Sequence, residues 1–323
     1  MKIRELVLAM VLGLGIPWLI YNLMEDTIPI NHISSFAQEK ETEAVDGLIP
    51  VSSQEIIMQV LMPDQTVLRM PLESYVAGVV LAEMPASFEI EALKAQAVAA
   101  RTYALKRYQT GKKHSTREVC TDPSCCQAYC SRSEYIDRGN GEKDADKIYE
   151  AAEQTAGLVL MYGSELIDAT YFSCSGGQTE DALAVWGQDI PYLRSVVSPG
   201  EEAASYYIDT VSFTREEVEE KLQKELTGDW LGSVSYTEGG GVDEIVIGGT
   251  SYKGTEIRTL LGLRSTAFFM TAVGDTVTVT TKGYGHRVGL SQYGADAMAV
   301  GGSDFEEILL HYYPGTVLQT YSP

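Results

Sequence analysis

The sequence predicts an α+β protein in which mixed helices and antiparallel hairpins form a two-lobed body with a cleft, behind one N-terminal transmembrane helix. Helical and hairpin segments follow one another without the regular strand–helix alternation of a doubly wound sheet. The 323 residues are enough for two ordinary domains. A long apolar run lies at the N-terminus, and a polar segment separates it from the rest of the chain.

The apolar run is Leu6–Met24, a stretch of 19 uncharged and mostly apolar positions that is long enough to span a bilayer as a helix. Basic residues precede the run and acidic residues follow it. The positive-inside rule therefore predicts a cytoplasmic tail at 1–5 and a single pass through the cell membrane, with the remaining chain outside. A cleaved signal peptide is the alternative, but the run is longer than usual and no small-x-small site follows it closely. Residues 25–54 are polar and predict a linker to a globular region at 55–323.

Turn and capping signals predict the elements of the globular region. A strand ending at Leu61 and a returning strand at Thr66–Met70 flank a turn, and Pro71 then opens a helix. Gly163-Ser164 suits a type II′ hairpin between strands at Leu158–Tyr162 and Glu165–Phe172. The other predicted elements are a helix from a capping box at Thr214 to near Gly228, strands at Val242–Ile247 and Thr276–Thr281, a helix at Thr255–Leu263, and a last helix opened by a capping box at Ser303 and Glu306.

Glu83 stands at the end of the helix that Pro71 opens, two residues before Pro85. Proline disfavours the helical conformation in the residue before it, so the helix is expected to stop near Met84. Apolar neighbours raise the pKa of a carboxyl group, and a carboxyl that stays protonated is suited to general-acid catalysis at a glycosidic bond. A solvated Glu on an amphipathic helix is the alternative. The Ala-rich segment that follows predicts a buried helix, in which polar residues need partners.

Four of the five cysteines lie within eleven residues, and a histidine precedes them. The cluster consists of His114, Cys120, Cys125, Cys126 and Cys130. Cysteine and histidine are the ligands that zinc prefers in closed, structural sites. Disulfides are an alternative in an exported protein, and free packed thiols are another.

The charge balance argues against one class of partner. The chain has 45 acidic and 24 basic residues and a net charge of −21, which opposes nucleic-acid binding but leaves a polysaccharide substrate open. The acidic run at Ser133–Asp146 lacks the order of a calcium-binding loop and predicts a solvated surface.

Three segments resemble the stage II sporulation protein D family, which also includes amidase enhancers. The first is Ala82-Glu83-Met84-Pro85 with the Ala-rich helix after it. The second is Tyr171-Phe172-Ser173-Cys174-Ser175-Gly176-Gly177-Gln178-Thr179, followed by Pro191-Tyr192-Leu193-Arg194. The third is Gly285-His286-Arg287-Val288-Gly289-Leu290-Ser291-Gln292-Tyr293-Gly294, in which Arg287 stands where a glycine is usual. The likeness covers roughly Glu55 to Val317.

The resemblance implies a membrane-anchored lytic transglycosylase that cleaves the MurNAc–GlcNAc bond of peptidoglycan glycan strands during sporulation. Glu83 would serve as the single general acid and base, and the product would carry a 1,6-anhydro-MurNAc end. The implied substrate is glycan stripped of stem peptides. The implied partners are the sporulation amidase/endopeptidase protein P and membrane protein M. A non-enzymatic amidase enhancer, which binds and stimulates a cell-wall amidase, is the alternative.

The resemblance also implies roles for particular residues. The implied substrate-binding residues are Arg101, Gln96, Tyr192, Arg194, Tyr171, Ser173, Ser175, His286 and Gln292. A structural ion pair is the alternative for Arg101, and a buried structural role is the alternative for His286. The implied structural zinc site, in a loop at about 110–132, uses His114, Cys120, Cys125 and Cys126, with Cys130 as an alternative fourth ligand. Cys174 is interpreted as a packed thiol rather than a nucleophile.

Overall fold

The structure is a computed structural model that describes residues 56–111, 114 and 119–322. These residues belong to one unit of the chain, Asp46–Pro323. The predicted cytoplasmic tail, transmembrane span and linker lie outside the described residues. Within the described part, no helix has the length and apolar character needed to cross a bilayer.

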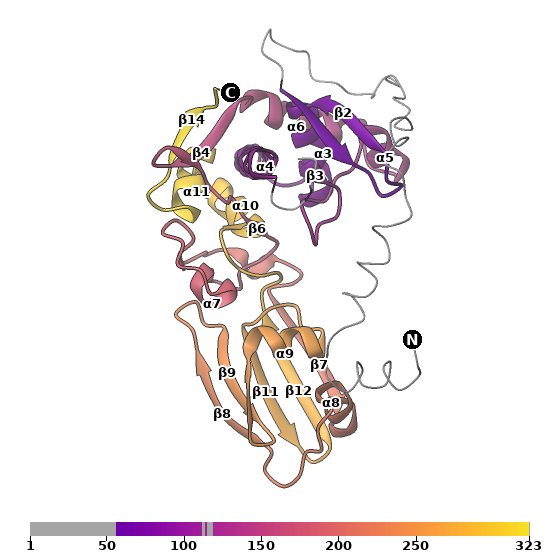
Figure 1. Ribbon diagram of the computed structural model, residues 1–323, viewed down its shortest axis with the longest axis vertical. Coiled ribbons are helices and arrows are strands. Elements are labelled where there is room, and N and C mark those ends of the chain that lie inside the picture. Colours follow the sequence, from indigo (N-terminus) through magenta and orange to yellow (C-terminus); the bar gives the residue numbers. More distant parts are fainter. Residues whose placement is uncertain (1–55, 112–113, 115–118, 323) are drawn as a thin grey trace, which may run out of the picture. The chain divides into compact units, whose positions relative to one another are not determined.

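The described elements build two hydrophobic cores (Figure 1). Residues before Ile208 and after Lys282 form the first core. Its elements are β1 (Ile57–Leu61), β2 (Val67–Pro71), α3 (Leu72–Glu83), α4 (Ile90–Thr110), β3 (Val119–Cys120), α5 (Arg132–Asp137), α6 (Glu142–Gln154), β4 (Leu158–Tyr162), β5 (Glu165–Leu166), β6 (Tyr171–Phe172), α7 (Ala182–Trp186), the 3-10 helix η1 (Glu201–Ala203), β13 (Leu290–Ser291), α10 (Gln292–Val300), α11 (Phe305–Tyr312) and β14 (Val317–Thr320).

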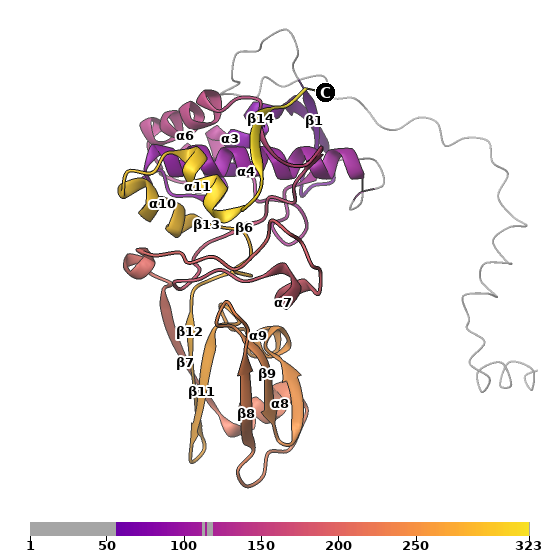
Figure 2. The same ribbon diagram turned by 90° about the vertical axis from the view of Figure 1, so that its left-hand side faces the viewer.

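Helix α4 is the centre of the first core. It contacts α3, α6, α10, α11 and β4, and Figure 2 shows these helices around it. Its alanines from Ala92 to Ala104 are completely buried. Small side chains let the neighbouring helices approach closely, so the Ala-rich sequence produces a helix that is packed on all sides, as the sequence predicts.

The second core is an insertion in the first. Its elements are β7 (Ile208–Thr214), α8 (Arg215–Leu222), β8 (Leu231–Tyr236), β9 (Val242–Ile247), β10 (Thr250–Lys253), α9 (Gly254–Leu261), β11 (Phe268–Val273) and β12 (Thr276–Lys282). They form two antiparallel sheets with the strand orders β10-β9-β8 and β11-β12-β7. The chain enters and leaves side by side, because the Gly283 amide donates to the Tyr207 carbonyl at 2.9 Å.

The structure confirms the α+β class with antiparallel sheets. Strands β1 and β2 pair as the predicted hairpin, and α3 ends at Glu83 with Met84 extended (φ −127°, ψ 139°) before Pro85. Gly163 has φ 60°, as the first loop position of a type II′ turn requires. The acidic run is exposed, although much of it lies on helices α5 and α6 rather than in a loop.

Three predicted boundaries are wrong. The strand predicted at Glu165–Phe172 is divided, because β5 pairs with β4 whereas β6 pairs in parallel with β13. Helix α8 ends at Leu222 rather than near Gly228, since Gln223 adopts the left-handed conformation that closes a helix. The last capping box is shifted by one residue: Asp304, not Ser303, caps α11, and its partner is Glu307.

Candidate active site and metal loop

Glu83 is the last residue of α3, and its side chain is partly exposed. Two neutral groups contact its carboxylate. The Ala128 amide donates to Oε1 and the Gln292 side-chain amide donates to Oε2, each at 3.3 Å. Within the described ranges, Glu83 forms no ion pair with a Lys, Arg or His.

Burial raises the pKa of Glu83, and the hydrogen bonds from Gln292 and Ala128 oppose that rise. Burial disfavours the charged carboxylate, whereas donated hydrogen bonds favour it. The absence of a paired cation in the described part lets the effect of burial dominate. Glu83 is therefore a carboxyl group that holds its proton at a higher pH than an ordinary glutamate.

The loop before α5 delivers the Ala128 amide to Glu83. The Cys130 amide donates to the carbonyl of Gly78 on α3 at 3.0 Å. A Cβ on Gly78 would lie only 2.3 Å from the Tyr129 ring, so a glycine is needed for this close approach. Gln127 is buried and donates to the Tyr171 hydroxyl at 2.8 Å. These contacts fix the loop against α3 and place Ala128 beside the carboxylate.

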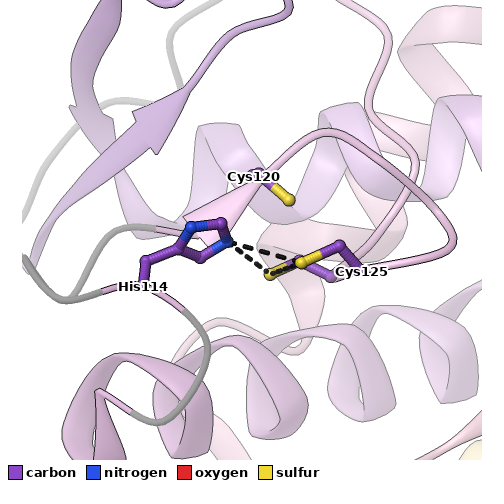
Figure 3. A group of neighbouring side chains, drawn as sticks. His114, Cys120 and Cys125 are labelled. Carbon is purple, nitrogen blue, oxygen red and sulfur yellow. Dashed lines mark hydrogen bonds between the residues drawn. The ribbon is translucent and has the colours of Figure 1, made fainter. Parts of the chain in front are cut away.

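The same loop carries a histidine–cysteine cluster (Figure 3). The ligand atoms of His114, Cys120, Cys125 and Cys126 all lie within 4.8 Å of one another. His114 Nε2 is 3.5 Å from the Cys125 sulfur and 3.6 Å from the Cys126 sulfur, and the two sulfurs are 3.9 Å apart. Cys130 is outside the cluster and directs its thiol to the Ser131 carbonyl.

The three distances among His114, Cys125 and Cys126 match tetrahedral ligation, whereas the cluster with Cys120 spreads to 4.8 Å and would have to contract around an ion. Zinc binds sulfur at about 2.3 Å and imidazole nitrogen at about 2.0–2.1 Å, which separates a nitrogen and a sulfur ligand by about 3.6 Å and two sulfurs by about 3.8 Å. No disulfide joins any of the five cysteines within the described residues, so the disulfide alternative is absent from the structure. The residues present fit a zinc ion with His114, Cys120, Cys125 and Cys126 as ligands.

In the described structure Arg101 forms neither a hydrogen bond nor an ion pair with Glu83. It is completely buried, its guanidinium forms an ion pair with Glu73, and it also donates to the carbonyls of Ala152 and Leu158. This geometry is the structural ion pair that the sequence left open as an alternative. Gln96 is also completely buried, and both of its amide atoms lack a hydrogen-bond partner among the described residues.

Tyr171 and His286 lie next to each other on the Glu83 side of the first core. Burial and the nearby Glu83 charge raise the pKa of Tyr171. The His286 side chain bonds to the Tyr171 backbone and accepts a hydrogen bond from the Val288 amide at Nδ1. Burial lowers the pKa of His286 to about 4, with Arg258 adding to the effect, so His286 is neutral at physiological pH.

Tyr192 and Arg194 each interact with aspartate residues, Tyr192 with a backbone amide and Arg194 with two carboxylates. The Tyr192 hydroxyl accepts a hydrogen bond from the Asp168 amide at 3.1 Å. Arg194 is 41% exposed and forms ion pairs with Asp181 and Asp189. Neither side chain forms a hydrogen bond or an ion pair with Glu83 in the part of the chain that the structure describes.

One of the two predicted serines, Ser175, binds a buried carboxylate that the sequence analysis missed. Glu201 Oε2 accepts hydrogen bonds from the amide and the hydroxyl of Ser175, both at 2.8 Å, and from the Cys174 thiol. Glu201 Oε1 accepts from the Ser291 hydroxyl at 2.6 Å, and Ser291 caps α10 immediately before Gln292. The Ser173 carbonyl also accepts from the Tyr293 amide on α10. Ser173 and Ser175 therefore position α10, and a lone Glu outside the motifs gave no sequence signal for this role.

Arg287 is the second residue whose role the sequence did not reveal. It is buried and has φ 65°, a conformation that favours glycine. Its guanidinium bonds to Glu180 and to the carbonyls of Ser175, Gln178 and Gly239. Gly239 lies in the turn between β8 and β9, so Arg287 ties the inserted core to the Ser-rich segment.

Together these features define an α+β protein in which a partly buried carboxyl group, Glu83, has no ion-pair partner among the described residues and lies beside a histidine–cysteine loop. Residues 64–162 match the family model described as stage II sporulation protein. The chain is 42% identical over 259 residues to stage II sporulation protein D of Bacillus subtilis (strain 168), which covers 78% of this chain and 76% of that protein. It is 41% identical over 258 residues to stage II sporulation protein D of Bacillus amyloliquefaciens, and the match covers 78% of this chain and 75% of that protein. The chain therefore belongs to the stage II sporulation protein D family.

The same comparisons include an amidase enhancer of Bacillus subtilis (strain 168). It is 30% identical over 305 residues, which cover 76% of this chain and 40% of that protein. The likeness to this branch therefore spans less than half of the enhancer.

Proposed function

We propose that this protein is a peptidoglycan lytic transglycosylase of sporulation, with Glu83 as its single general acid and base. The observation that carries the proposal is the setting of Glu83: partly exposed, desolvated, without an ionic partner in the described part, and with a raised pKa. A carboxyl group in that state is matched to proton donation near neutral pH. Membership of the family supports the cell-wall substrate.

One carboxyl group is sufficient for the proposed reaction. Protonated Glu83 donates its proton to the glycosidic oxygen as the bond from C1 of MurNAc to that oxygen breaks. The leaving GlcNAc then carries a free hydroxyl. The 6-hydroxyl of the same MurNAc attacks C1, and its proton passes to the Glu83 carboxylate. The product is a 1,6-anhydro-MurNAc end, Glu83 is protonated again, and no water is consumed.

The neighbours of Glu83 act on its orientation and its proton affinity. The Ala128 and Gln292 donors each fix one carboxylate oxygen and stabilise the charged form that the first step creates. His286 is neutral and accepts a hydrogen bond from the Val288 amide at Nδ1, so it does not supply a cationic acid to the reaction near neutral pH.

We further propose that zinc is a structural cofactor of the metal loop. A closed set of four protein ligands leaves no position for substrate, so the ion would stabilise the fold. Cys126 is two residues before Ala128, whose amide contacts Glu83. The zinc site would thereby hold one of the two donors of the active carboxyl group in place.

The remaining expectations concern the setting of the enzyme in the cell. We propose that Leu6–Met24 anchors the protein in the membrane with the globular region outside. We also propose peptide-stripped glycan as the substrate, and the sporulation proteins P and M as partners. Fractionation of cells tests the anchor, because the intact chain should sediment with membranes, and a shortened chain free outside the cell would instead indicate a cleaved signal peptide.

Cleavage assays with matched variants test the activity. Purified, peptide-stripped glycan strands are incubated with the wild-type protein, with Glu83→Gln and with Glu216→Gln, an exposed control on α8. Wild type and the control should release anhydro ends, and Glu83→Gln should release none because an amide cannot relay the proton. Full activity of Glu83→Gln would remove Glu83 from the mechanism. Binding without any cleavage by wild type would favour the amidase-enhancer alternative.

A further inference from the structure

Arg258 is a partly buried cation that has no ion-pair partner among the described residues. Eight of the ten described arginines form ion pairs, and the two that do not are Arg69 and Arg258. Arg69 is exposed on β2 and is solvated, whereas Arg258 is partly withdrawn from water. Its Nε donates a hydrogen bond to the Leu263 carbonyl, and its two terminal nitrogens have no hydrogen-bond acceptor within the described part of the chain. Withdrawing a guanidinium from water destabilises the folded protein unless an anion pairs with it.

The fold brings Arg258 to the same loop that carries His286. Arg258 lies in the last turn of α9, and the chain continues through Leu263 to Arg264. The Arg264 carbonyl accepts a hydrogen bond from the Gly285 amide at 3.0 Å, between Tyr284 and His286. The charge of Arg258 acts on both of those side chains.

Two aromatic ring pairs flank this loop, Trp186 with His286 and Tyr206 with Tyr284, and we call these four residues the aromatic patch; its exposed members are Trp186, Tyr206 and Tyr284. The Trp186 and His286 rings are 5.2 Å apart, and so are the Tyr206 and Tyr284 rings. Trp186 is 40% exposed and Tyr284 is 41% exposed, so each keeps ring surface available for stacking. Exposed aromatic rings with a polar edge are suited to the apolar faces of sugars.

The patch is connected to the proposed catalytic carboxyl group through a single residue. The Tyr171 backbone forms a hydrogen bond with the His286 side chain. The negative charge of Glu83 contributes to the raised pKa of the Tyr171 phenol. Tyr171 therefore lies between the patch and Glu83.

We propose that Arg258 and the aromatic patch form a subsite for an acidic sugar, in which Arg258 binds the lactyl carboxylate of a muramyl residue. This inference rests on the proposed function for the identity of the glycan. Planar guanidinium nitrogens pair with both oxygens of a carboxylate, and Tyr284 or Trp186 supplies a stacking surface for the sugar ring. The lactyl group is a free carboxylate only when no stem peptide is attached, since the peptide converts it into a neutral amide. The subsite would therefore select peptide-stripped strands.

The charges around the patch support an anionic ligand at Arg258 in particular. Arg264 also lies over the Tyr206 and Tyr284 rings, but Asp209 neutralises it at 2.6 Å. In a chain with a net charge of −21, an unpaired cation is a local attraction for an acidic glycan.

Binding measurements on a non-cleaving background test the subsite. The ligands are a peptide-free MurNAc–GlcNAc tetrasaccharide, the same oligosaccharide with its lactyl groups amidated, and a neutral chitin tetrasaccharide. The proteins are Glu83→Gln alone and combined with Arg258→Gln, Arg258→Lys or the control Arg69→Gln. Glu83→Gln should bind the carboxylate form about tenfold to hundredfold more tightly than the amidated form.

The variants should change that preference selectively. Arg258→Gln should reduce the ratio to about one while leaving the affinity for the amidated and chitin ligands unchanged. Arg258→Lys should keep part of the preference, and Arg69→Gln should keep all of it. Equal binding of the three ligands by Glu83→Gln alone would overturn the inference without any Arg258 variant. Equal loss of all ligands in a folded Arg258→Gln variant would also overturn it.

The outcome is separable from that of the cleavage assay. A carboxylate preference that depends on Arg258, without anhydro products from wild type, would reject the transglycosylase and keep the subsite. Anhydro products from wild type, without a preference for the carboxylate ligand, would support the transglycosylase and reject the subsite.

Discussion

At the scale of single residues, the chemistry depends on how Glu83 is solvated. Its two hydrogen-bond donors are neutral, and its raised pKa comes from burial. Arg101 shows the opposite arrangement, because its buried charge is matched by Glu73. The sequence could identify both as polar residues in apolar surroundings, but only the fold shows which of them has a charged partner.

The raised pKa of Glu83 predicts a dependence of stability on pH. A carboxyl group with a higher pKa in the folded protein than in the unfolded chain contributes stability that is fully present below the unfolded pKa and is lost as the pH rises through the folded pKa. Gln is uncharged throughout, so Glu83→Gln should be more stable than wild type above the folded pKa of Glu83. The difference should vanish in acid, and denaturant unfolding at several pH values measures it. A wild-type protein that is the more stable at high pH would contradict the assigned cause.

Gln292 should tune the pH profile of activity. Its hydrogen bond lowers the pKa of Glu83, so Gln292→Ala should raise that pKa. Because the acid must be protonated, activity falls as the pH rises through this pKa, and the falling limb should move to higher pH in the variant. Gln109→Ala, which removes a distant bond to Tyr321, is the control. A limb that moves to lower pH would exclude Gln292 as a donor to the carboxylate.

At the scale of elements, the metal loop and α10 bring separate donors to one helix end. The loop is fixed by Gly78, Gln127 and the histidine–cysteine cluster, and it supplies Ala128. Helix α10 is fixed by Glu201 through its cap at Ser291, and it supplies Gln292. The proposed active site is therefore assembled from segments that are about 45 and about 209 residues away from Glu83 in the chain.

Cys126 and Cys130 form a matched pair for testing the metal. Cys126→Ser should lower bound zinc below one ion per chain and reduce the free energy of unfolding by roughly 2–5 kcal/mol, because metal-binding energy supports the fold. Cys130→Ser changes a buried thiol outside the cluster and should leave the metal content unchanged. Elemental analysis and thermal unfolding measure the two effects. Equal metal loss in both variants would place Cys130 among the ligands.

Local signals predicted the elements that are fixed locally. Pro85 ends α3, Thr214 with Glu217 opens α8, and the alanines identify α4 as buried. The errors occur where distant partners decide the structure. Strand β6 leaves the predicted hairpin because it pairs with β13, almost 120 residues further along the chain. The role of Glu201 also depends on segments that are remote in sequence, and no local pattern could predict it.

At the scale of the whole described chain, an inserted core is joined to the core that carries Glu83. Arg287 and Glu180 lie at this junction, and the turn that they hold needs glycines because a Cβ on Gly241 would lie 2.3 Å from the Glu180 carboxylate. The Arg258 subsite also involves both cores, since α9 belongs to the inserted core and His286 follows it. The described residues form two hydrophobic cores, and the two-lobed body with a cleft stays a prediction.

Arg287→Gly tests this junction by restoring the glycine that is usual in the family. Glycine relieves the left-handed backbone, but the variant loses the bonds to three carbonyls and leaves Glu180 buried without its cation. Removing one partner of a buried ion pair reduces the free energy of unfolding by about 3–5 kcal/mol. Relief of the backbone strain offsets part of this, so we expect a net reduction of about 2–4 kcal/mol. Denaturant unfolding measures the loss, and Arg215→Gly, at an exposed ion pair, should cost less than half as much. A stabilised Arg287→Gly protein would show that backbone strain outweighs the ion pair.

The central claim is that Glu83 transfers a proton while the muramyl 6-hydroxyl, not water, attacks C1. Mass spectrometry of glycan strands cleaved in water enriched in oxygen-18 tests it most directly. The account predicts muramyl ends that are lighter than a hydrolysed end by one water and carry no oxygen-18, and it predicts that Glu83→Gln forms none of them. Reducing ends that contain oxygen-18 would show hydrolysis, and would contradict the account.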